Sequence, residues 1–239
     1  RAASLEALVP TLGKLCEQTG LRWGTHGRLD QAADPRPGPK GMTRLEALSA
    51  SGCVYVGFGA ESASPRVLHE MNKGGTMLTS GTERIGGYDL PKTMLVGYAA
   101  TVAAGIHANC TWIMSWPGAT VSDEKASVTF QEWQKSLTGN AAAVNSALFV
   151  AQAYPGTAMF ANLKVQNRLR EGFGLEFDKY GQPVCDDALL EYVLELDDAT
   201  KVLHDKAGRP IFYGDTTEDM FLRMRELVAN GKTEEILSL

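Results

Sequence analysis

The residues whose types and spacing suit a ligand site gather in one segment, Gly57 to Ser64, which reads Gly-Phe-Gly-Ala-Glu-Ser-Ala-Ser. Its two glycines, the second being Gly59, permit a ligand to approach the backbone closely, because no Cβ stands in the way. The Glu61 carboxylate can accept hydrogen bonds from hydroxyl or ammonium groups. Ser62 and Ser64 either cap the following helix or bond a ligand. A second interpretation stays open, in which the glycines serve packing and Glu61 is a surface acid.

Three further segments carry residues of similar interest. The guanidinium of Arg28 could hold a ligand carboxylate through a bidentate fork, or form a salt bridge with Asp30. An apolar run ends in Ser115-Trp116-Pro117-Gly118, and another ends in Tyr154-Pro155-Gly156-Thr157. Taken alone, Pro-Gly marks any tight turn, so neither of these two endings requires a ligand.

The elements that would position these segments alternate between strand and helix. Alternation of this kind predicts an α/β fold with parallel strands, right-handed helical crossovers and a ligand site at the carboxyl ends of the strands. Gly74 to Asp89 has no clear period and is expected to be a long loop. A mostly helical tail follows, which predicts a division into residues 1–163 and 164–239. The expected strands lie at 21–29, 53–59, 110–115 and 146–151, and the expected helices at 1–20, 42–51, 65–71, 91–104, 122–137, 187–196 and 218–229.

The segment from Gly57 to Gly74 resembles the fourth-strand signature of radical S-adenosylmethionine (SAM) enzymes, G-x-E-S-x-S followed by V-L-x-x-M-N-K-G, especially in the class that often carries a cobalamin-binding domain. Residues 111–120 resemble the fifth strand of that family, which ends in G-x-P-G-E-T. Here Ser115 and Ala119 replace the usual glycine and glutamate. Residues 153–157 are similar to the sixth-strand ending P-Y-P-G-T, with Ala153 in place of the first proline, and residues 22–30 are similar to the third strand.

The resemblance covers about residues 5–157 and implies a partial (β/α) barrel of the radical SAM type. It also implies that SAM lies across the strand ends. The residues expected to contact SAM are Arg28, Gly59, Glu61, Ser62, Ser64, Ser115, Trp116, Pro117, Tyr154 and Pro155.

The cysteine motif of that family, C-x-x-x-C-x-x-C, is absent from the 239 residues, and the four cysteines lie far apart. A [4Fe–4S] cluster is therefore expected only through a segment not in this chain, the missing N-terminal part of the same protein, and no metal ligand or catalytic residue is assigned here. With that segment the enzyme would form a 5′-deoxyadenosyl radical for hydrogen abstraction or methyl transfer, and cobalamin would be a further cofactor. The chain alone is expected to be inactive.

Composition and charge limit which binding partners and which cellular location are expected for the chain. The net charge is −5 and no Lys or Arg stripe occurs, so no nucleic-acid surface is evident. No apolar stretch is long enough for a membrane span. The four cysteines have no paired spacing and are expected to be reduced thiols, which is typical of a cytoplasmic location. Two other functions stay open: a relative without a cluster that serves as a binding or scaffold subunit, which the changes at Ser115 and Ala119 favour, and an unrelated metabolic α/β barrel with Glu61 as general base. Of the histidines, only His26 lies near an expected strand end.

Overall fold

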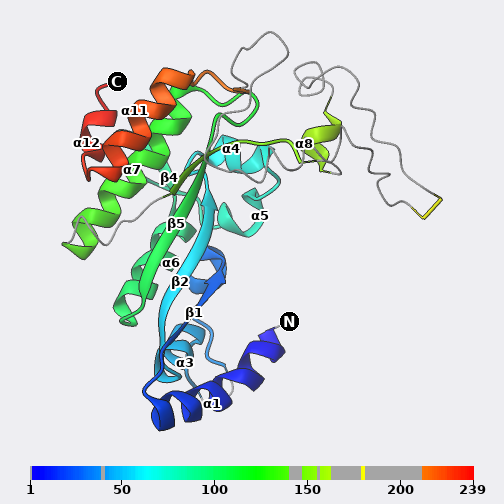
Figure 1. The fold of residues 1–239 in the computed structure, drawn as a ribbon, viewed down its shortest axis with the longest axis vertical. Helices are drawn as coiled ribbons and strands as arrows, with labels where there is room; N and C mark the ends of the chain where they lie inside the picture. Colours follow the sequence, from blue (N-terminus) through cyan, green and yellow to red (C-terminus); the bar gives the residue numbers. More distant parts are fainter. Residues whose placement is uncertain (1, 39–40, 140–146, 155–156, 163–178, 181–211) are drawn as a thin grey trace. The chain divides into compact units, whose positions relative to one another are not determined.

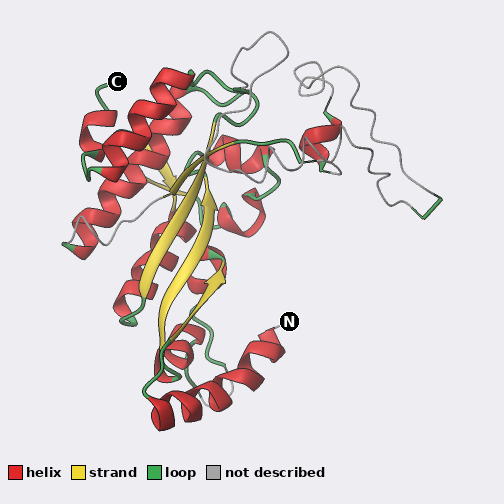
Figure 2. Ribbon diagram, viewed as in Figure 1, coloured by secondary structure: helices red, strands yellow, loops and turns green. Residues whose placement is uncertain are grey.

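The computed structural model describes residues 2–38, 41–139, 147–154, 157–162, 179–180 and 212–239. Helices and strands alternate through most of the described chain (Figures 1 and 2). Their order is α1 (Ala2–Thr19), β1 (Trp23–Gly27), α2 (Leu29–Ala32), α3 (Arg44–Ala50), β2 (Cys53–Glu61), α4 (Pro65–Glu70), α5 (Gly74–Met77), β3 (Thr82–Ile85), β4 (Tyr88–Pro91), α6 (Lys92–Ala103), β5 (His107–Met114), α7 (Val121–Thr138), β6 (Ala147–Val150), α8 (Ala158–Ala161), α11 (Glu218–Ala229) and α12 (Thr233–Ile236).

The larger sheet has the strand order β1-β2-β5-β6, and β2 pairs in parallel with both β1 and β5. Helices connect its successive strands. The α/β class with parallel strands and helical crossovers, and the presence of helices near the C-terminus, are therefore confirmed. The predicted strands and helices are found within a few residues of their expected bounds. The helix expected at 187–196 lies outside the described residues.

One face of β5 holds the core, because every second side chain along this strand is buried, as at Ala108, Cys110, Trp112 and Met114. Phe130 of α7 lies at the centre of an aromatic cluster there. Its ring centroid is 5.4 Å from that of Trp112, 5.2 Å from Trp133 and 6.3 Å from Tyr98 of α6. Such tilted and edge-on pairs add to the free energy gained by burial. The cluster therefore fixes α6 and α7 against β5.

The predicted long loop from Gly74 to Asp89 is wrong. This segment contains the short helix α5 and an antiparallel hairpin, β3–β4, in which Ile85 pairs with Tyr88. The two residues between the strands are Gly86 and Gly87, with φ of 56° and 89°. Positive φ at both central residues is what a tight two-residue hairpin turn of type I′ requires, and glycine adopts it without a steric penalty.

Helices α2 and α6 approach each other closely at Gly97. A Cβ added to Gly97 would lie 2.1 Å from the carbonyl oxygen of Leu29, far inside contact distance. Glycine is therefore required by the packing of these two helices, and not by its backbone conformation, since its φ is not in the left-handed region.

The chain forms two compact units, of which the first comprises residues 1–112, 122–148 and 224–239, and the second 113–121 and 149–223. Within the first unit, Lys135 of α7 donates to the carbonyl of Gly231 at 2.9 Å, and Lys125 donates to that of Leu237 at 3.1 Å. The predicted boundary at 163/164 falls beside residues outside the description and stays a prediction. Among the helices that are described, none combines the length and apolarity needed to cross a bilayer.

Candidate functional site

Glu61, the last residue of β2, has an unusual backbone. Its φ is 65°, and the N–H of Ser62 donates to the carbonyl of Ala60 at 2.8 Å, so that Glu61 is the central residue of a γ-turn. The form of this turn with positive φ is rare and strained. A non-glycine residue with positive φ costs of the order of 1–3 kcal/mol, and such residues cluster at active sites and ligand-binding sites. The strain marks the carboxyl end of β2 as a candidate site.

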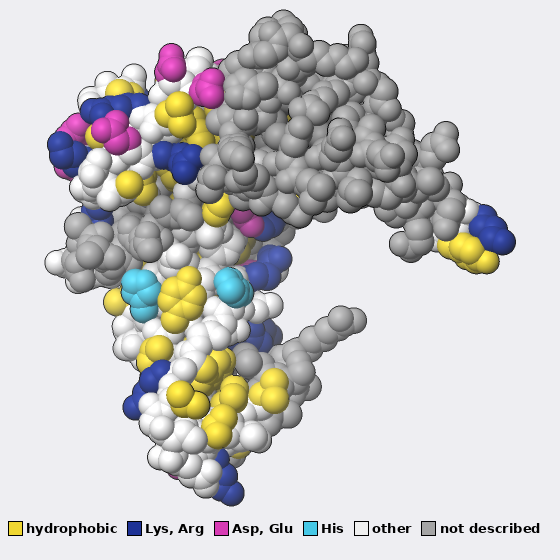
Figure 3. Space-filling model, viewed as in Figure 1, with side chains coloured by type: hydrophobic (Ala, Val, Ile, Leu, Met, Phe, Trp, Pro, Cys, Tyr) yellow, Lys and Arg dark blue, Asp and Glu magenta, His cyan; other side chains and the backbone are white. Residues whose placement is uncertain are grey.

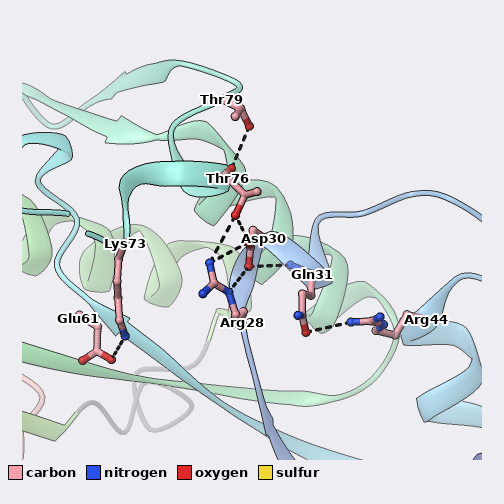
Figure 4. Close-up of polar contacts among 8 residues, drawn as sticks. All are labelled: Arg28, Asp30, Gln31, Arg44, Glu61, Lys73, Thr76 and Thr79. Carbon is pink, nitrogen blue, oxygen red and sulfur yellow. Dashed lines mark hydrogen bonds and ion pairs between the residues drawn. The ribbon is translucent and has the colours of Figure 1, made fainter. Parts of the chain in front are cut away.

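The Glu61 carboxylate is held over Gly59 by Lys73, whose Nζ donates to Oε1 (Figure 4). A Cβ on Gly59 would lie 2.7 Å from that same Oε1. The glycine therefore makes room for the chain's own carboxylate. The Glu61 side chain is 16% exposed, and within the described residues its other oxygen, Oε2, has no hydrogen-bond partner. One acceptor oxygen is thus available to a ligand.

Sequence reasoning missed Lys73. It lies in the quoted M-N-K-G run, but no role was assigned to it. In the structure α4 ends at Glu70, Asn72 turns with φ of 55°, and the N–H of Lys73 donates to the carbonyl of Leu68 at 2.8 Å. This helix ending directs Lys73 back towards β2. The sequence did carry a signal for this role, because Lys73 is a basic residue in a run that follows the acidic Glu61 at the strand end.

Ser62 and Ser64 are buried, and their hydroxyls have partners within the chain. Ser64 Oγ accepts from the N–H of Val67 at 3.4 Å, as the N-cap of α4, and donates to Asp123 at 2.6 Å. Ser62 Oγ accepts from the N–H of Ser64 at 3.1 Å. The capping role that the sequence left open for Ser64 is therefore observed, and both hydroxyls fix the turn that presents Glu61.

Arg28 forms the salt bridge with Asp30 that was one of its two expected roles. Nε donates to Oδ1 at 3.0 Å and the terminal nitrogen to Oδ2 at 3.1 Å, while Thr76 also donates to Oδ2 (Figure 4). Burial by itself raises the pKa of Asp30, but the hydrogen bonds from Arg28 and Thr76 outweigh it, and the net shift is downward. The fork of Arg28 is thus committed to Asp30.

Replacing Asp30 with asparagine tests this pair through pH. A carboxyl whose pKa is lowered on folding stabilises the fold above its unfolded pKa, about 4, and loses that contribution as the pH falls through the folded value. We expect Asp30→Asn to lower stability at pH 7 by at most about 1 kcal/mol, as for other partly exposed ion pairs. The gap between the two urea midpoints should narrow below pH 4. A gap that is constant from pH 7 to 3 would contradict this assignment.

His26 belongs to the more accessible face of the sheet. Its ring covers Gly57, where an added Cβ would lie 2.8 Å from Cδ2. Nearby, Tyr55 stacks on His107 with ring centroids 5.8 Å apart, and Asn109 donates to the Tyr55 hydroxyl at 3.3 Å. Figure 3 shows histidine and hydrophobic side chains together on the face in view. The space over both glycines of the segment is thus filled by side chains of the chain itself.

In the second unit, Ser115 also has positive φ, 59°, where the related motif has glycine. Its side chain is buried, and Oγ accepts from the N–H of Gly214 at 3.0 Å. Residues 213–215 pair with the turn after Ser115 through two further backbone hydrogen bonds, Gly118 to Tyr213 and Asp215 to Ala119. The hydroxyl of Ser115 is therefore used to hold this segment.

The remaining predicted contacts also lie in the second unit. Trp116 and Pro117 are half-buried, and Tyr154 is 40% exposed and donates to Gln152 at 3.2 Å. Pro155 lies outside the described residues. Binding of SAM by these residues stays a prediction.

The described cysteines do not fit an iron–sulfur cluster. Cys16, Cys53 and Cys110 are buried and make no disulfide. Within the described ranges, no three His, Cys, Asp or Glu side chains form a group able to hold a metal ion. Burial raises the pKa of the Cys110 thiol to about 12, although a hydrogen bond from Gln134 opposes the shift.

No protein-family model matches the chain, and no curated protein matches it. Among solved structures, it is similar to the radical S-adenosylmethionine methyltransferase TsrM from Kitasatospora setae, with tryptophan substrate and a SAM analog bound. The identity is 16% and the TM-score 0.45, over 99% of this chain and 50% of that chain. It is also similar to the cobalamin-dependent S-adenosylmethionine radical enzyme OxsB with aqua-cobalamin and S-adenosylmethionine bound. There the identity is 14% and the TM-score 0.39, over 91% and 30% of the two chains.

The chain therefore spans about half the length of the TsrM chain. A fold likeness at this level does not decide function, which depends on the residues of the site.

Proposed function

We propose that this chain binds S-adenosylmethionine at the carboxyl end of β2, as part of a radical SAM enzyme. The observation that carries the proposal is the state of Glu61: a strained γ-turn presents its carboxylate, Lys73 holds one oxygen, and the other has no partner among the described residues. Backbone strain of this kind persists only where the surrounding structure holds it in place, and it clusters at active sites and ligand-binding sites. The match of residues 57–74 to the family signature supplies the identity of the ligand.

The chemistry of the ligand suits this carboxylate. SAM carries ribose hydroxyls and an ammonium group, and each can donate to Glu61 Oε2. In the proposal, Ser62 and Ser64 act by fixing the turn, because their hydroxyls are already bonded within the chain. Gly59 contributes the space in which the carboxylate lies.

The adenosyl part of SAM is assigned to the turns at 115–117 and 154–155 on the motifs alone. Arg28 is a weaker candidate for a ligand contact, because its fork is occupied by Asp30.

The redox part of the reaction needs components beyond these residues. A [4Fe–4S] cluster would come from a segment outside the 239 residues, and cobalamin rests on the resemblance alone. The proposal for this chain is therefore SAM binding, and radical formation, with hydrogen abstraction or methyl transfer, belongs to the whole enzyme. A binding or scaffold subunit without a cluster is the second candidate, favoured by Ser115 and Ala119, which replace the glycine and glutamate of the family motif.

Isothermal titration of the 239-residue chain with SAM tests the proposal. We expect saturable binding with one site, and Glu61→Gln should weaken it about tenfold, the loss expected for one hydrogen bond to a charged group. Glu83→Gln is the matched control, since it removes the same charge from an exposed position on β3 and should leave the affinity unchanged. No binding by the unmodified chain, or equal binding by Glu61→Gln, would contradict the proposal.

A further inference from the structure

We propose that Lys73 is a positioning residue for this site: it fixes the Glu61 carboxylate over Gly59 so that Oε2 alone is left for the ligand. The inference rests on the proposed function for the identity of the ligand, but not for the pairing of the two side chains. It gives a role to a residue that neither the motif nor the fold class assigns.

Three local features converge on this arrangement. The γ-turn fixes the direction in which the Glu61 side chain leaves the backbone. Gly59 has no Cβ, and the carboxylate lies in the space that a Cβ would need. A Cβ built on Gly59 would also lie 3.8 Å from Lys73 Nζ. The ending of α4, closed by the 2.8 Å hydrogen bond from Lys73 to Leu68, brings the lysine to the end of the strand. Backbone geometry therefore sets both partners before the ion pair forms.

The same geometry explains why Lys73 differs from an ordinary surface partner. The Glu61 side chain is only 16% exposed and that of Lys73 is 40% exposed, so the pair is partly withdrawn from water. An ammonium is a compact charge with three donors, and one donor is enough to orient a carboxylate. With Oε1 held, Oε2 points to one place instead of sampling several rotamers. A ligand then binds without the entropic cost of ordering that side chain.

Affinity for SAM in a double-mutant cycle tests the role of Lys73. Lys73→Met should weaken SAM binding about fivefold in the unmodified chain but change it less than about twofold in the Glu61→Gln background, because contacting residues give non-additive effects. Lys73→Arg should recover most of the affinity. Lys92→Met removes a charge from an exposed position on α6 and should leave binding unchanged. A lysine that merely stabilised the fold would weaken binding equally in both backgrounds.

Urea unfolding without ligand separates this inference from the proposed function. The four proteins of the cycle are compared: the unmodified chain, Lys73→Met, Glu61→Gln and the double variant. Lys73→Met should lower the urea midpoint in the unmodified chain and leave it unchanged in the Glu61→Gln background. If the effect of Lys73→Met on the urea midpoint depended on Glu61 but none of the four proteins bound SAM, the proposed function would be refuted and the pairing of Lys73 with Glu61 supported. Equal changes in the urea midpoint in both backgrounds would overturn the inference. Full SAM affinity in Lys73→Met would also overturn it, even if the midpoints showed coupling, because Lys73 and Glu61 would then form only a surface ion pair.

Discussion

Gly97→Ala is expected to destabilise the chain by about 3 kcal/mol or more, the upper part of the range for overpacked sites. The new methyl carbon would lie 2.1 Å from the Leu29 carbonyl oxygen, 2.9 Å from its carbonyl carbon and 3.2 Å from the Ala33 nitrogen. All three are backbone atoms, so no side chain can rotate away to relieve the clash. Helices α2 and α6 would have to separate, and α2 immediately follows the strand that leads to Arg28.

The sign of this effect is informative because helix propensity predicts the opposite. Alanine within a helix is about 1 kcal/mol more favourable than glycine. Gly75→Ala in α5 is the matched control, since nothing lies within 4 Å of its added Cβ and its φ is ordinary. Urea unfolding followed by circular dichroism should show Gly97→Ala well below the unmodified chain and Gly75→Ala at or slightly above it. Equal midpoints for the two variants would mean that the helices do not approach as described.

Phe130→Ala is expected to cost about 3–5 kcal/mol, the range for removing a large aromatic side chain from a core. Phe130 is fully buried and contacts the rings of Trp112, Trp133 and Tyr98. Truncation leaves a cavity among rigid rings that cannot collapse to fill it. The contribution of Trp112 and Trp133 to the near-ultraviolet circular dichroism should also weaken.

A truncation on the solvent side of the same region provides the comparison. Val96 of α6 is 46% exposed, and Val96→Ala should change the free energy of unfolding by less than about 0.5 kcal/mol. If Phe130→Ala were as mild as Val96→Ala, α7 would not pack on β5 through this cluster.

Hydrophobic patterns were sufficient to predict the main elements, because the buried strands and the amphipathic helices have clear periods. The hairpin was missed although it has a local signal. Gly86-Gly87 lies between two short runs with strand-like residues, Thr82–Ile85 and Tyr88–Pro91. A two-residue Gly-Gly connection is a recognised hairpin turn. The surrounding glycines and threonines concealed it, since β3 is exposed and has no apolar alternation.

The site was predictable only in part. The position of Glu61 at a strand end follows from the pattern of β2, but its pairing with Lys73 depends on how α4 ends. Whether Arg28 bonds a ligand or Asp30, and whether Ser64 caps a helix, were balanced alternatives in the sequence. Side-chain directions decide such choices, and those directions follow from tertiary packing, as in the bond from Ser64 to Asp123.

The hydrogen bonds from α7 to backbone carbonyls that follow α11 also determine when the chain can complete its folding during synthesis. Lys125 and Lys135 bond carbonyls that are 112 and 96 residues later in the sequence. During synthesis, α7 leaves the ribosome before the whole of residues 149–223, and at about 5–20 residues per second its C-terminal partners arrive several seconds later. Through that interval the first unit is incomplete. Folding of the first unit is therefore expected to be completed only after α11 and α12 have left the ribosome.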